Sequence, residues 1–394
     1  MRTLVLKKDE DRRISAGHLW VFSNEVDTRK SPLADFAPGE EATLLDARGK
    51  ALGSLCVNPG SLICGRLHSR LPRTPLDETL LRQRLAQALD MRQRRFSEPW
   101  YRLCHGEGDL LPGLIIDRYD GHLTLQIGTA AMEARKPLLV RCLEELLRPV
   151  SLRFDNDIPA RGLEGLSREE ETLGPVPEFL EVPENGCRFT VPAARGQKTG
   201  WFYDQRANRR EFARYAAGAD VLDIFSYAGG FGVTAAAQGA ASVTFLDASE
   251  AALDLCRRNL EANAPGLSAA MQTLAGDAFQ RLGELAASGR RFSLVSLDPP
   301  AFIKRRKDAA QGLAAYRKIN LLAASLLAPG GILATSSCSH HLDADELGRC
   351  IARAAARLGR PARILYAGGQ GPDHPVHAAM PETAYLKCRI VRFD

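Results

Sequence analysis

From residue 220 onward the sequence alternates short apolar runs with segments of helical spacing, and this alternation limits the fold more than any other feature. The apolar runs lie at residues 221–225, 243–246, 292–297 and 331–334. Each has the length of a strand and is apolar throughout, as strands are when both faces of a sheet are covered. Strands that alternate with helices build doubly wound α/β domains. The sequence therefore predicts a mostly parallel sheet with helices on both faces.

The first 190 residues have a different pattern and predict two smaller domains. Residues 1 to about 70 contain short alternating runs separated by Pro-Gly, Arg-Gly and Asn-Pro-Gly turns, which is typical of a small β-rich module. Residues 101 to about 190 indicate strand, strand, helix, strand, strand. The strands are expected near 114–119, 123–128, 152–154 and 187–191, and the helix at 133–147. We expect domains at 1–72, 73–190 and 191–394, which a chain of 394 residues is long enough to hold.

Residues 76–96, between these two modules, predict an amphipathic helix. The spacing depends on Leu76, Leu80, Leu81, Leu85 and Leu89, and the arginines between them are Arg82, Arg84, Arg92, Arg94 and Arg95. This cationic face could bind RNA or could simply be solvated. The aromatic stretch at residues 18–22 could likewise stack on bases, although packing in the core is the favoured interpretation.

Composition excludes some classes of protein. No apolar run approaches the roughly 18 residues of a membrane-spanning helix, and the N-terminus has no apolar stretch followed by a small-residue cleavage site. We therefore expect a cytoplasmic protein with no membrane partner. The nine cysteines form no CxxC pair and no histidine lies at ligand spacing, so we expect reduced thiols and no metal. Ten of the 52 basic residues are lysine and the rest are arginine, which suits phosphate contacts but also fits a compositional bias.

Glycines and carboxylates follow the predicted strands, where parallel sheets bind nucleotides. Gly229, Gly230 and Gly232 allow the backbone to approach a ligand at the start of a helix. The spacing is not GxGxxG, so a single nucleoside fits better than a dinucleotide, and a nicotinamide dehydrogenase is unfavoured. Asp247, at the end of the second strand, could accept hydrogen bonds from both ribose hydroxyls, and Asp277 could bind an adenine edge. The same turn contributes Asp223, Phe225 and Tyr227 as candidate cofactor contacts.

Asp298 and Cys338 follow what should be the fourth and fifth strands. Adjacent strands lie about 5 Å apart, so both side chains could reach one flipped-out base. A cysteine taken alone is usually a buried, inert thiol. At the ligand end of a parallel sheet, one strand from Asp298, the nucleophile interpretation is favoured.

The loop after Asp298 has the features expected of a substrate-binding loop. Pro299 and Pro300 remove backbone donors and stiffen the chain, and Phe302 could stack on the base. Four positively charged residues follow Phe302 and Ile303, and they predict a site that binds RNA phosphates. The alternative is that they are the solvated start of a helix. These cations are Lys304, Arg305, Arg306 and Lys307.

These motifs resemble the S-adenosylmethionine site of class I methyltransferases, and more closely the RlmI-like family of bacterial large-subunit ribosomal RNA cytosine-5 methyltransferases. The matching segments are residues 196–206, 223–232, 298–302 and 337–341. The resemblance spans nearly the whole chain and implies a PUA domain, a central EEHEE domain and a Rossmann-like sheet with one antiparallel strand. In the family the first of these segments closes over the cofactor, which nominates Lys198, Asp204 and Gln205. The implied partner is 23S ribosomal RNA, and a homodimer is left open.

The resemblance also implies a reaction. C5 of cytosine is a poor nucleophile, so its methylation requires a thiolate to attack C6, and Cys338 is nominated for this step. Asp298 would face the amino and N3 edge of the base. A base must then remove the C5 proton, and His340, His341, Asp298 and water all remain open for that role. Another group of RNA cytosine-5 enzymes has a second cysteine beside the proline pair, where this chain has Ala301.

Two other functions fit part of the sequence. A methyltransferase acting on a nitrogen of guanine or adenine would also use the Asp298 loop but would have no use for Cys338. A noncatalytic RNA-binding assembly factor would use the N-terminal module and the arginine-rich helix, and it would not bind S-adenosylmethionine.

Overall fold

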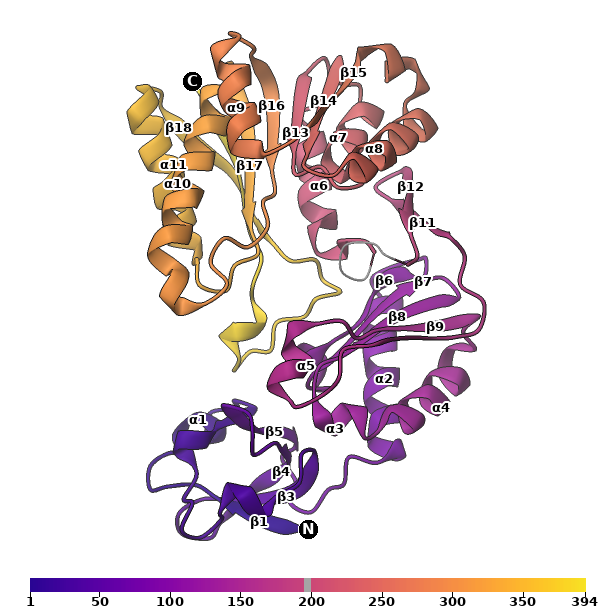
Figure 1. Cartoon of the computed structure of the whole chain (residues 1–394), viewed down its shortest axis with the longest axis vertical. Coiled ribbons are helices and arrows are strands. Elements are labelled where there is room, and N and C mark those ends of the chain that lie inside the picture. The colour runs from indigo at the N-terminus through magenta and orange to yellow at the C-terminus, as the bar shows by residue number, and fades with distance from the viewer. Residues whose placement is uncertain (195–199) are drawn as a thin grey trace. The chain divides into compact units, whose positions relative to one another are not determined.

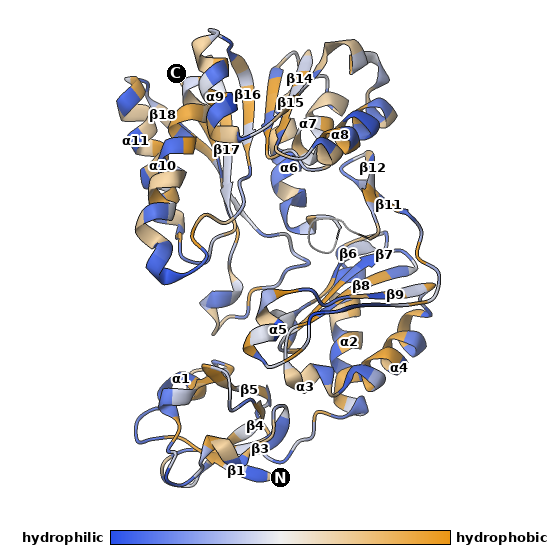
Figure 2. Ribbon diagram, viewed as in Figure 1, coloured by the Kyte–Doolittle hydropathy of each residue, from blue (hydrophilic) through white to orange (hydrophobic). Residues whose placement is uncertain are grey.

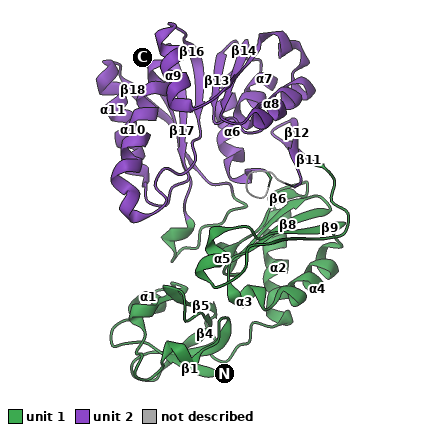
Figure 3. Cartoon of the chain, in the orientation of Figure 1, with its two compact units in different colours: residues 1–178, 195–200, 372–383 green, residues 179–194, 201–371, 384–394 purple. Residues whose placement is uncertain are grey.

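The computed structural model describes residues 1–194 and 200–394, which fall into two compact units (Figures 1 and 3). Unit 1 comprises Met1–Glu178, Arg195–Gly200 and Pro372–Thr383. Unit 2 comprises Phe179–Ala194, Trp201–Gly371 and Ala384–Asp394. The segment Pro372–Thr383 therefore belongs to unit 1 although the chain on either side of it belongs to unit 2. The limits of three consecutive domains at residues 72 and 190 stay predictions.

Unit 2 is built on a seven-stranded sheet with the order β15-β14-β13-β16-β17-β19-β18. The strands are β13 (Asp220–Ile224), β14 (Ser242–Asp247), β15 (Met271–Ala275), β16 (Phe292–Leu297), β17 (Leu327–Ser337), β18 (Ala362–Gly369) and β19 (Lys387–Phe393). Strands β13 to β17 pair in parallel, whereas β19 is antiparallel to both of its neighbours. The predicted α/β class, mostly parallel with one antiparallel strand, is confirmed.

Helices cover both faces of this sheet. They are α6 (Arg206–Ala213), α7 (Gly230–Ala237), α8 (Glu250–Asn263), α9 (Ala278–Ala287), α10 (Ala309–Ser325) and α11 (Ala344–Leu358). Helices α6, α7 and α8 pack together on one face, and α9, α10 and α11 on the other (Figure 1). Buried residues such as Leu222, Val295 and Leu333 form the core between sheet and helices. Figure 2 shows the hydrophilic residues along α8 and at one end of α10, away from that core.

A two-stranded sheet of β11 (Phe179–Glu184) and β12 (Cys187–Pro192) also belongs to unit 2. We predicted residues 187–191 as the last strand of the central domain, and this is wrong. Within the described residues the run pairs with β11 and with no other strand, and β12 packs against α7 and α8. The alternating pattern identified a strand correctly, but it carries no information about which sheet the strand joins.

Unit 1 contains two five-stranded sheets. The N-terminal sheet has the order β1-β3-β4-β5-β2, from β1 (Arg2–Val5), β2 (Trp20–Phe22), β3 (Glu40–Leu45), β4 (Ala51–Val57) and β5 (Ile63–Ser69). The small β-rich module is therefore confirmed. The second sheet has the order β10-β9-β8-β7-β6, from β6 (Trp100–His105), β7 (Leu114–Tyr119), β8 (His122–Ile127), β9 (Ser151–Asp155) and β10 (Glu170–Leu173). Both edge strands of this sheet, β6 and β10, were missed. All four residues of β10 are exposed and lack an apolar pattern.

The helices of unit 1 are α1 (Arg12–Ser15), α2 (Glu78–Gln93), α3 (Ala130–Glu133), α4 (Lys136–Leu147) and α5 (Pro159–Leu163). Helix α2 confirms the predicted amphipathic helix, but its arginines are engaged within unit 1. Arg92 is buried and forms two hydrogen bonds with the Asp109 carboxylate, at 2.5 and 2.8 Å. Arg82 pairs with Glu78 and Glu145, and Arg94 pairs with Asp90.

Trp20 of the aromatic stretch is also engaged, because its Nε1 donates to Glu107 Oε1 at 2.7 Å. Packing is therefore sufficient to explain the aromatic stretch, as the favoured interpretation expected. None of the described helices combines the length and the apolar character that crossing a bilayer requires.

Candidate functional site

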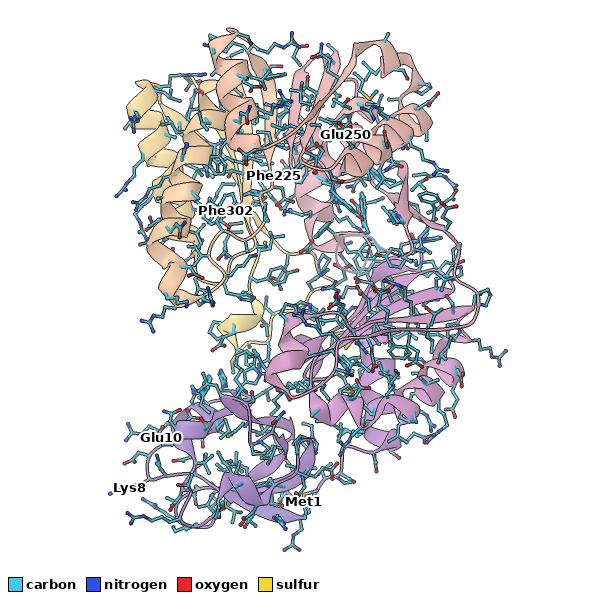
Figure 4. All side chains as sticks on the ribbon, viewed as in Figure 1. Met1, Lys8, Glu10, Phe225, Glu250 and Phe302 are labelled. Carbon is cyan, nitrogen blue, oxygen red and sulfur yellow. The ribbon has the colours of Figure 1, made fainter. Side chains whose placement is uncertain are left out.

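The carboxyl ends of four adjacent parallel strands meet at one edge of the sheet in unit 2. Their order is β14, β13, β16, β17, and the register pairs Ile224 with both Leu246 and Leu297, and Leu297 with Thr335. Figure 4 labels Phe225 and Phe302, which follow β13 and β16 at this edge. The predicted site residues Asp247, Asp298 and Cys338 follow or end the same strands. Open α/β sheets bind their ligands at such an edge.

The turn after β13 has an unusual backbone. Phe225, Tyr227 and Gly229 have φ angles of 62°, 50° and 79°, and the first two are non-glycine residues in the left-handed region. Such conformations are strained and persist only where surrounding bonds hold them. Here the Phe225 N–H donates to Leu246 O at 2.8 Å, and the Gly229 N–H donates to Ser226 O at 2.7 Å. The turn is thus held rigidly at the start of α7.

The side chain of Asp223 stabilises this turn through hydrogen bonds. Its buried carboxylate accepts hydrogen bonds from the Gly232 N–H, at 2.8 Å, and from the Ser296 hydroxyl. Burial raises the pKa of Asp223 to about 7, and the charges of Asp298 and Asp247 act in the same direction. Because this side chain is buried, it stabilises the turn from within, and a contact of Asp223 with a cofactor stays a prediction.

The glycines have packing roles in addition to any approach to a ligand. A Cβ atom at Gly232 would collide with the Phe245 ring, so the absence of a side chain allows α7 to lie close to β14. A Cβ at Gly229 would lie 2.9 Å from Val233, and a Cβ at Gly230 would lie 2.8 Å from Arg209. Their contacts with a cofactor stay predictions.

Asp247 fits the predicted ribose contact. It ends β14, and its two oxygens accept from the Tyr227 N–H at 3.0 Å and the Ser249 N–H at 2.9 Å. A carboxylate has about four lone-pair sites, so two remain for the hydroxyls of a ribose. The hydrogen-bond acceptors at this edge therefore suit the hydroxyls of a nucleoside. Asp277 is exposed and caps α9 by accepting from the Gln280 N–H at 3.0 Å, which is the common role of such a residue.

Asp298 is held by a chain of amide side chains. Its Oδ1 accepts from Gln205 Nε2 at 2.8 Å, and Gln205 Oε1 accepts in turn from Asn208 Nδ2 at 2.6 Å. Asn208 also donates to Gly369 O at 3.1 Å. The structure thus brings the predicted residue Gln205 to Asp298, although it lies far from Asp298 in the sequence. Asn208 was missed, because nothing in the local sequence distinguishes it from any other helical asparagine.

The segment that carries Gln205 is anchored to the β11–β12 hairpin. Buried Glu184 accepts from Trp201 Nε1 at 2.9 Å and pairs with Arg209 at 2.7 Å and Arg206 at 3.2 Å. Asp204, also predicted, accepts from the Tyr385 hydroxyl at 2.6 Å. Lys198 lies outside the described residues.

Cys338 follows the end of β17 and differs from the other cysteines. It is half-buried, whereas the remaining eight are buried. The flanking Ser337 donates to Tyr316 Oη at 2.9 Å, and the Ser339 hydroxyl donates to Ile303 O at 2.6 Å. These bonds connect both sides of Cys338 to α10 and to the loop after β16.

Tyr316 lies in the field of both predicted catalytic residues. Burial raises the pKa of Tyr316 to about 12, and the charges of Cys338 and Asp298 also raise it. Strands β16 and β17 pair in parallel, so the prediction that Asp298 and Cys338 follow neighbouring strands is confirmed. Tyr316 was missed because its helix showed only an apolar pattern.

The loop after β16 is partly packed and partly exposed. Pro299 is buried and Pro300 exposed. The Phe302 ring lies 4.9 Å from the Tyr316 ring and 5.9 Å from the Phe279 ring, so it packs at the edge of the core. The four cations, Lys304, Arg305, Arg306 and Lys307, are exposed. Arg305 pairs with Asp308 at 3.0 Å, and contacts of this loop with RNA stay predictions.

Comparison with known proteins identifies relatives over the whole chain. A family model of S-adenosylmethionine-dependent methyltransferases matches residues 165–378, and a model of PUA-like domains matches residues 4–70. Ribosomal RNA large subunit methyltransferase I of Escherichia coli (strain K12) is 36% identical over 399 residues, covering 98% of this chain and 99% of that protein. The protein of the same name from Cronobacter sakazakii is 36% identical over 392 residues, covering 98% and 97%.

Solved structures share the fold. A putative S-adenosylmethionine-dependent methyltransferase from Streptococcus mutans matches with a TM-score of 0.84 at 21% identity and covers 100% of both chains. A structure described as a putative methyltransferase complexed with SAH matches with the same TM-score, identity and coverage.

Proposed function

The chain belongs to the S-adenosylmethionine-dependent methyltransferase family that includes ribosomal RNA large subunit methyltransferase I, and we propose that it methylates a cytosine of 23S ribosomal RNA at C5. Its cofactor is S-adenosylmethionine. One observation carries the proposal: the only half-buried cysteine of the nine follows β17, beside the strand that leads to Asp298.

S-adenosylmethionine supplies an electrophilic methyl group. Asp247 would accept hydrogen bonds from the ribose hydroxyls, and the rigid turn from Phe225 to Gly229 would lie against the nucleoside. Gln205 fixes one oxygen of Asp298. A carboxylate has about four lone-pair sites, so Asp298 could also accept from the exocyclic amino group of a cytosine. That bond would orient the ring for attack at C6.

The reaction needs a covalent bond between Cys338 and the base. The thiolate would attack C6, the electron pair of the C5–C6 double bond would make C5 nucleophilic, and C5 would take the methyl group as the sulfur–methyl bond of the cofactor breaks and S-adenosylhomocysteine leaves. A base then removes the C5 proton, the double bond forms again, and the thiolate leaves. Ala301 supplies no second thiol to assist this release, so Cys338 would act alone.

Ribosomal RNA as the substrate is supported by the relatives and by the PUA-like match at the N-terminus. The exposed cations Lys304, Arg305, Arg306 and Lys307 would neutralise phosphates beside the target base. Contacts of this kind are expected to position the RNA and to weaken as salt is added.

The decisive experiment replaces Cys338 by alanine and assays methylation of 23S ribosomal RNA from cells that lack the protein. We expect loss of methyl transfer with unchanged binding of S-adenosylmethionine by calorimetry. Wild-type protein should also form a denaturation-resistant adduct with RNA containing 5-fluorocytidine. In this analogue C5 carries fluorine in place of the proton that a base would remove, so the covalent intermediate cannot break down.

The matched control is Cys350→Ala in α11, which removes a buried thiol that the proposed reaction does not use, and this variant should remain active and form the adduct. Methylation at the wild-type rate by Cys338→Ala would refute the cytosine-5 reaction and favour transfer to a nitrogen of guanine or adenine.

A further inference from the structure

Lys387 lies directly beside the Cys338 segment, and no sequence motif pointed to it. It begins β19 and pairs with Ser337 in the antiparallel register between β17 and β19. Its Nζ donates to Ser339 O at 2.6 Å and to Tyr385 O at 2.8 Å. An ammonium group has three N–H donors, and two are thereby held by carbonyls, one of them on the residue that follows Cys338.

The charge of Lys387 interacts with that of Cys338. Partial burial lowers the pKa of Lys387, while the negative charges of Cys338 and Asp343 act in the opposite direction. A cation and a thiolate in such proximity stabilise each other's charged forms.

Three described groups near the Cys338 segment differ from Lys387 in charge or exposure. Tyr316 on α10 is uncharged at neutral pH, as phenols ordinarily are, and burial raises its pKa further, to about 12. A negative charge on Asp298, after β16, disfavours a nearby thiolate. His340, in the same loop as Cys338, is exposed to solvent, with its ring 5.9 Å from that of Tyr385.

We propose that Lys387 is a positioning residue that holds a positive charge beside Cys338 and thereby maintains the thiolate that attacks C6. The inference rests on the proposed function and deepens it. When the thiol ionises, its proton passes to solvent water, and Lys387 keeps all three of its own. The S–C6 bond then forms from a sulfur that is already anionic, as nucleophilic cysteines require.

The test measures the reactivity of Cys338 without RNA or cofactor. The full-length protein is treated with iodoacetamide over a range of pH, and the modified Cys338 peptide is quantified by mass spectrometry. The other eight cysteines are buried, so the reaction should be selective. We expect the midpoint of the pH profile in Lys387→Gln to lie about one unit above that of the wild type. The rate near neutral pH should then fall about tenfold.

Two variants separate charge from structure. A glutamine side chain is neutral yet can still donate to both carbonyls, so Lys387→Gln tests the charge, whereas Lys387→Arg keeps the charge and should retain a profile close to wild type. Lys318→Met removes an exposed cation from α10 and should leave the profile unchanged. If Lys387→Gln proves unstable by thermal unfolding, Lys387→Met provides the same neutral substitution with a different shape.

An unchanged midpoint in the neutral variants would overturn the proposal. Equal shifts in Lys387→Gln and Lys387→Arg would also overturn it, because they would indicate that Lys387 only shapes the loop. Failure of this test, with methylation still dependent on Cys338, would leave the proposed function intact. Conversely, a raised midpoint in Lys387→Gln together with full methylation by Cys338→Ala would refute the proposed cytosine-5 reaction. It would leave intact the inference that Lys387 stabilises the thiolate.

Discussion

Asp223 is a carboxyl group whose burial makes its charge depend on pH near neutrality. Its pKa is raised to about 7 in the folded protein, from an ordinary value of 3.8. The folded state therefore binds a proton that the unfolded chain has already released at pH 5 to 6. Its contribution to stability is complete below the unfolded pKa and is lost as pH rises through about 7.

We therefore expect the free energy of unfolding of the wild type to fall, relative to Asp223→Asn, between about pH 4 and pH 8. The difference should be at most about 4 kcal/mol, from three pKa units at 1.36 kcal/mol each. An asparagine can accept from the Gly232 N–H and donate to Ser296, so the turn should persist. Urea unfolding across this range measures the difference, and parallel pH profiles for the two proteins would contradict the prediction.

Residue types at the strand ends could be predicted from the sequence, but their partners could not. Asp247 and Asp298 lie where the apolar runs indicated, because a strand end is a local property. The partners of Asp223 and Asp298 are Ser296 and Gln205, which are remote in the chain. Such pairings depend on how the strands are ordered, and no local pattern records that order.

At the scale of elements, two asparagine side chains on α8 form hydrogen bonds with the backbone of β12, as a neighbouring strand would do. Asn259 accepts from the Thr190 N–H at 2.7 Å and donates to Thr190 O at 3.1 Å. Asn263, one turn later, makes the same pair of bonds with Arg188, at 2.8 and 2.7 Å. The amides thus satisfy backbone groups at an edge that would otherwise be open to another strand. Asn259 also donates to Ala228 O at 2.9 Å, which connects the hairpin to the turn before α7.

Asn259→Leu should destabilise unit 2 by about 2 kcal/mol or more, because it removes the partner of the buried Ala228 carbonyl and of the partly buried Thr190 backbone. Asn259 is fully buried, whereas Asn263 is only half-buried. The matched variant Asn263→Leu should therefore cost less, since water can replace its bonds. Thermal unfolding and amide exchange at Thr190 and Arg188 measure the effect, and equal losses in the two variants would refute the argument.

Three interior strands of unit 2 were predictable, whereas the interior strand β19 and both edge strands, β15 and β18, were not. Strands β13, β14 and β16 agree with the predicted runs to within one residue, because strands buried on both faces need continuous apolar sequence. Strand β15 lies at the edge of the sheet and includes the polar residues Gln272 and Thr273. None of its residues is fully buried, so a continuous apolar run is not required there.

At the scale of the whole molecule, one buried carboxylate connects the N-terminal module to helix α3, within unit 1. Glu164 accepts from Asn58 Nδ2 at 2.6 Å and pairs with Arg66 at 3.2 Å, both from the N-terminal module. The same side chain accepts from the Ala130 N–H, at the start of α3, at 3.2 Å. Breaking a buried ion pair from one side leaves an uncompensated charge and is costly.

We expect Glu164→Ala to destabilise unit 1 by about 3 to 5 kcal/mol and to speed amide exchange in the N-terminal sheet. The control is Glu145→Ala, which removes an exposed partner of Arg82 and should cost less than about 1 kcal/mol. Hydrogen exchange of the full-length protein measures both effects. Unaltered exchange in β3, β4 and β5 of Glu164→Ala would show that the carboxylate does not join the modules.

The assignment of Pro372–Thr383 to unit 1 could not be predicted from the sequence. Asp373 in this segment accepts from the Arg102 N–H at 3.1 Å, and its backbone carbonyl accepts from Arg92 at 2.7 Å. Both partners lie about 270 or more residues earlier in the chain. Division of a sequence into consecutive domains assumes that neighbours in the chain fold together, and this segment does not obey that assumption.

The unequal burial of the nine cysteines also determines which thiol is expected to oxidise first during storage of the protein. Peroxide in solution reaches the Cys338 sulfur before it reaches the other eight, and a sulfenic acid there can be reduced whereas further oxygenation is irreversible. Under the proposed reaction, protein stored without reductant would therefore lose methyl transfer while keeping its fold.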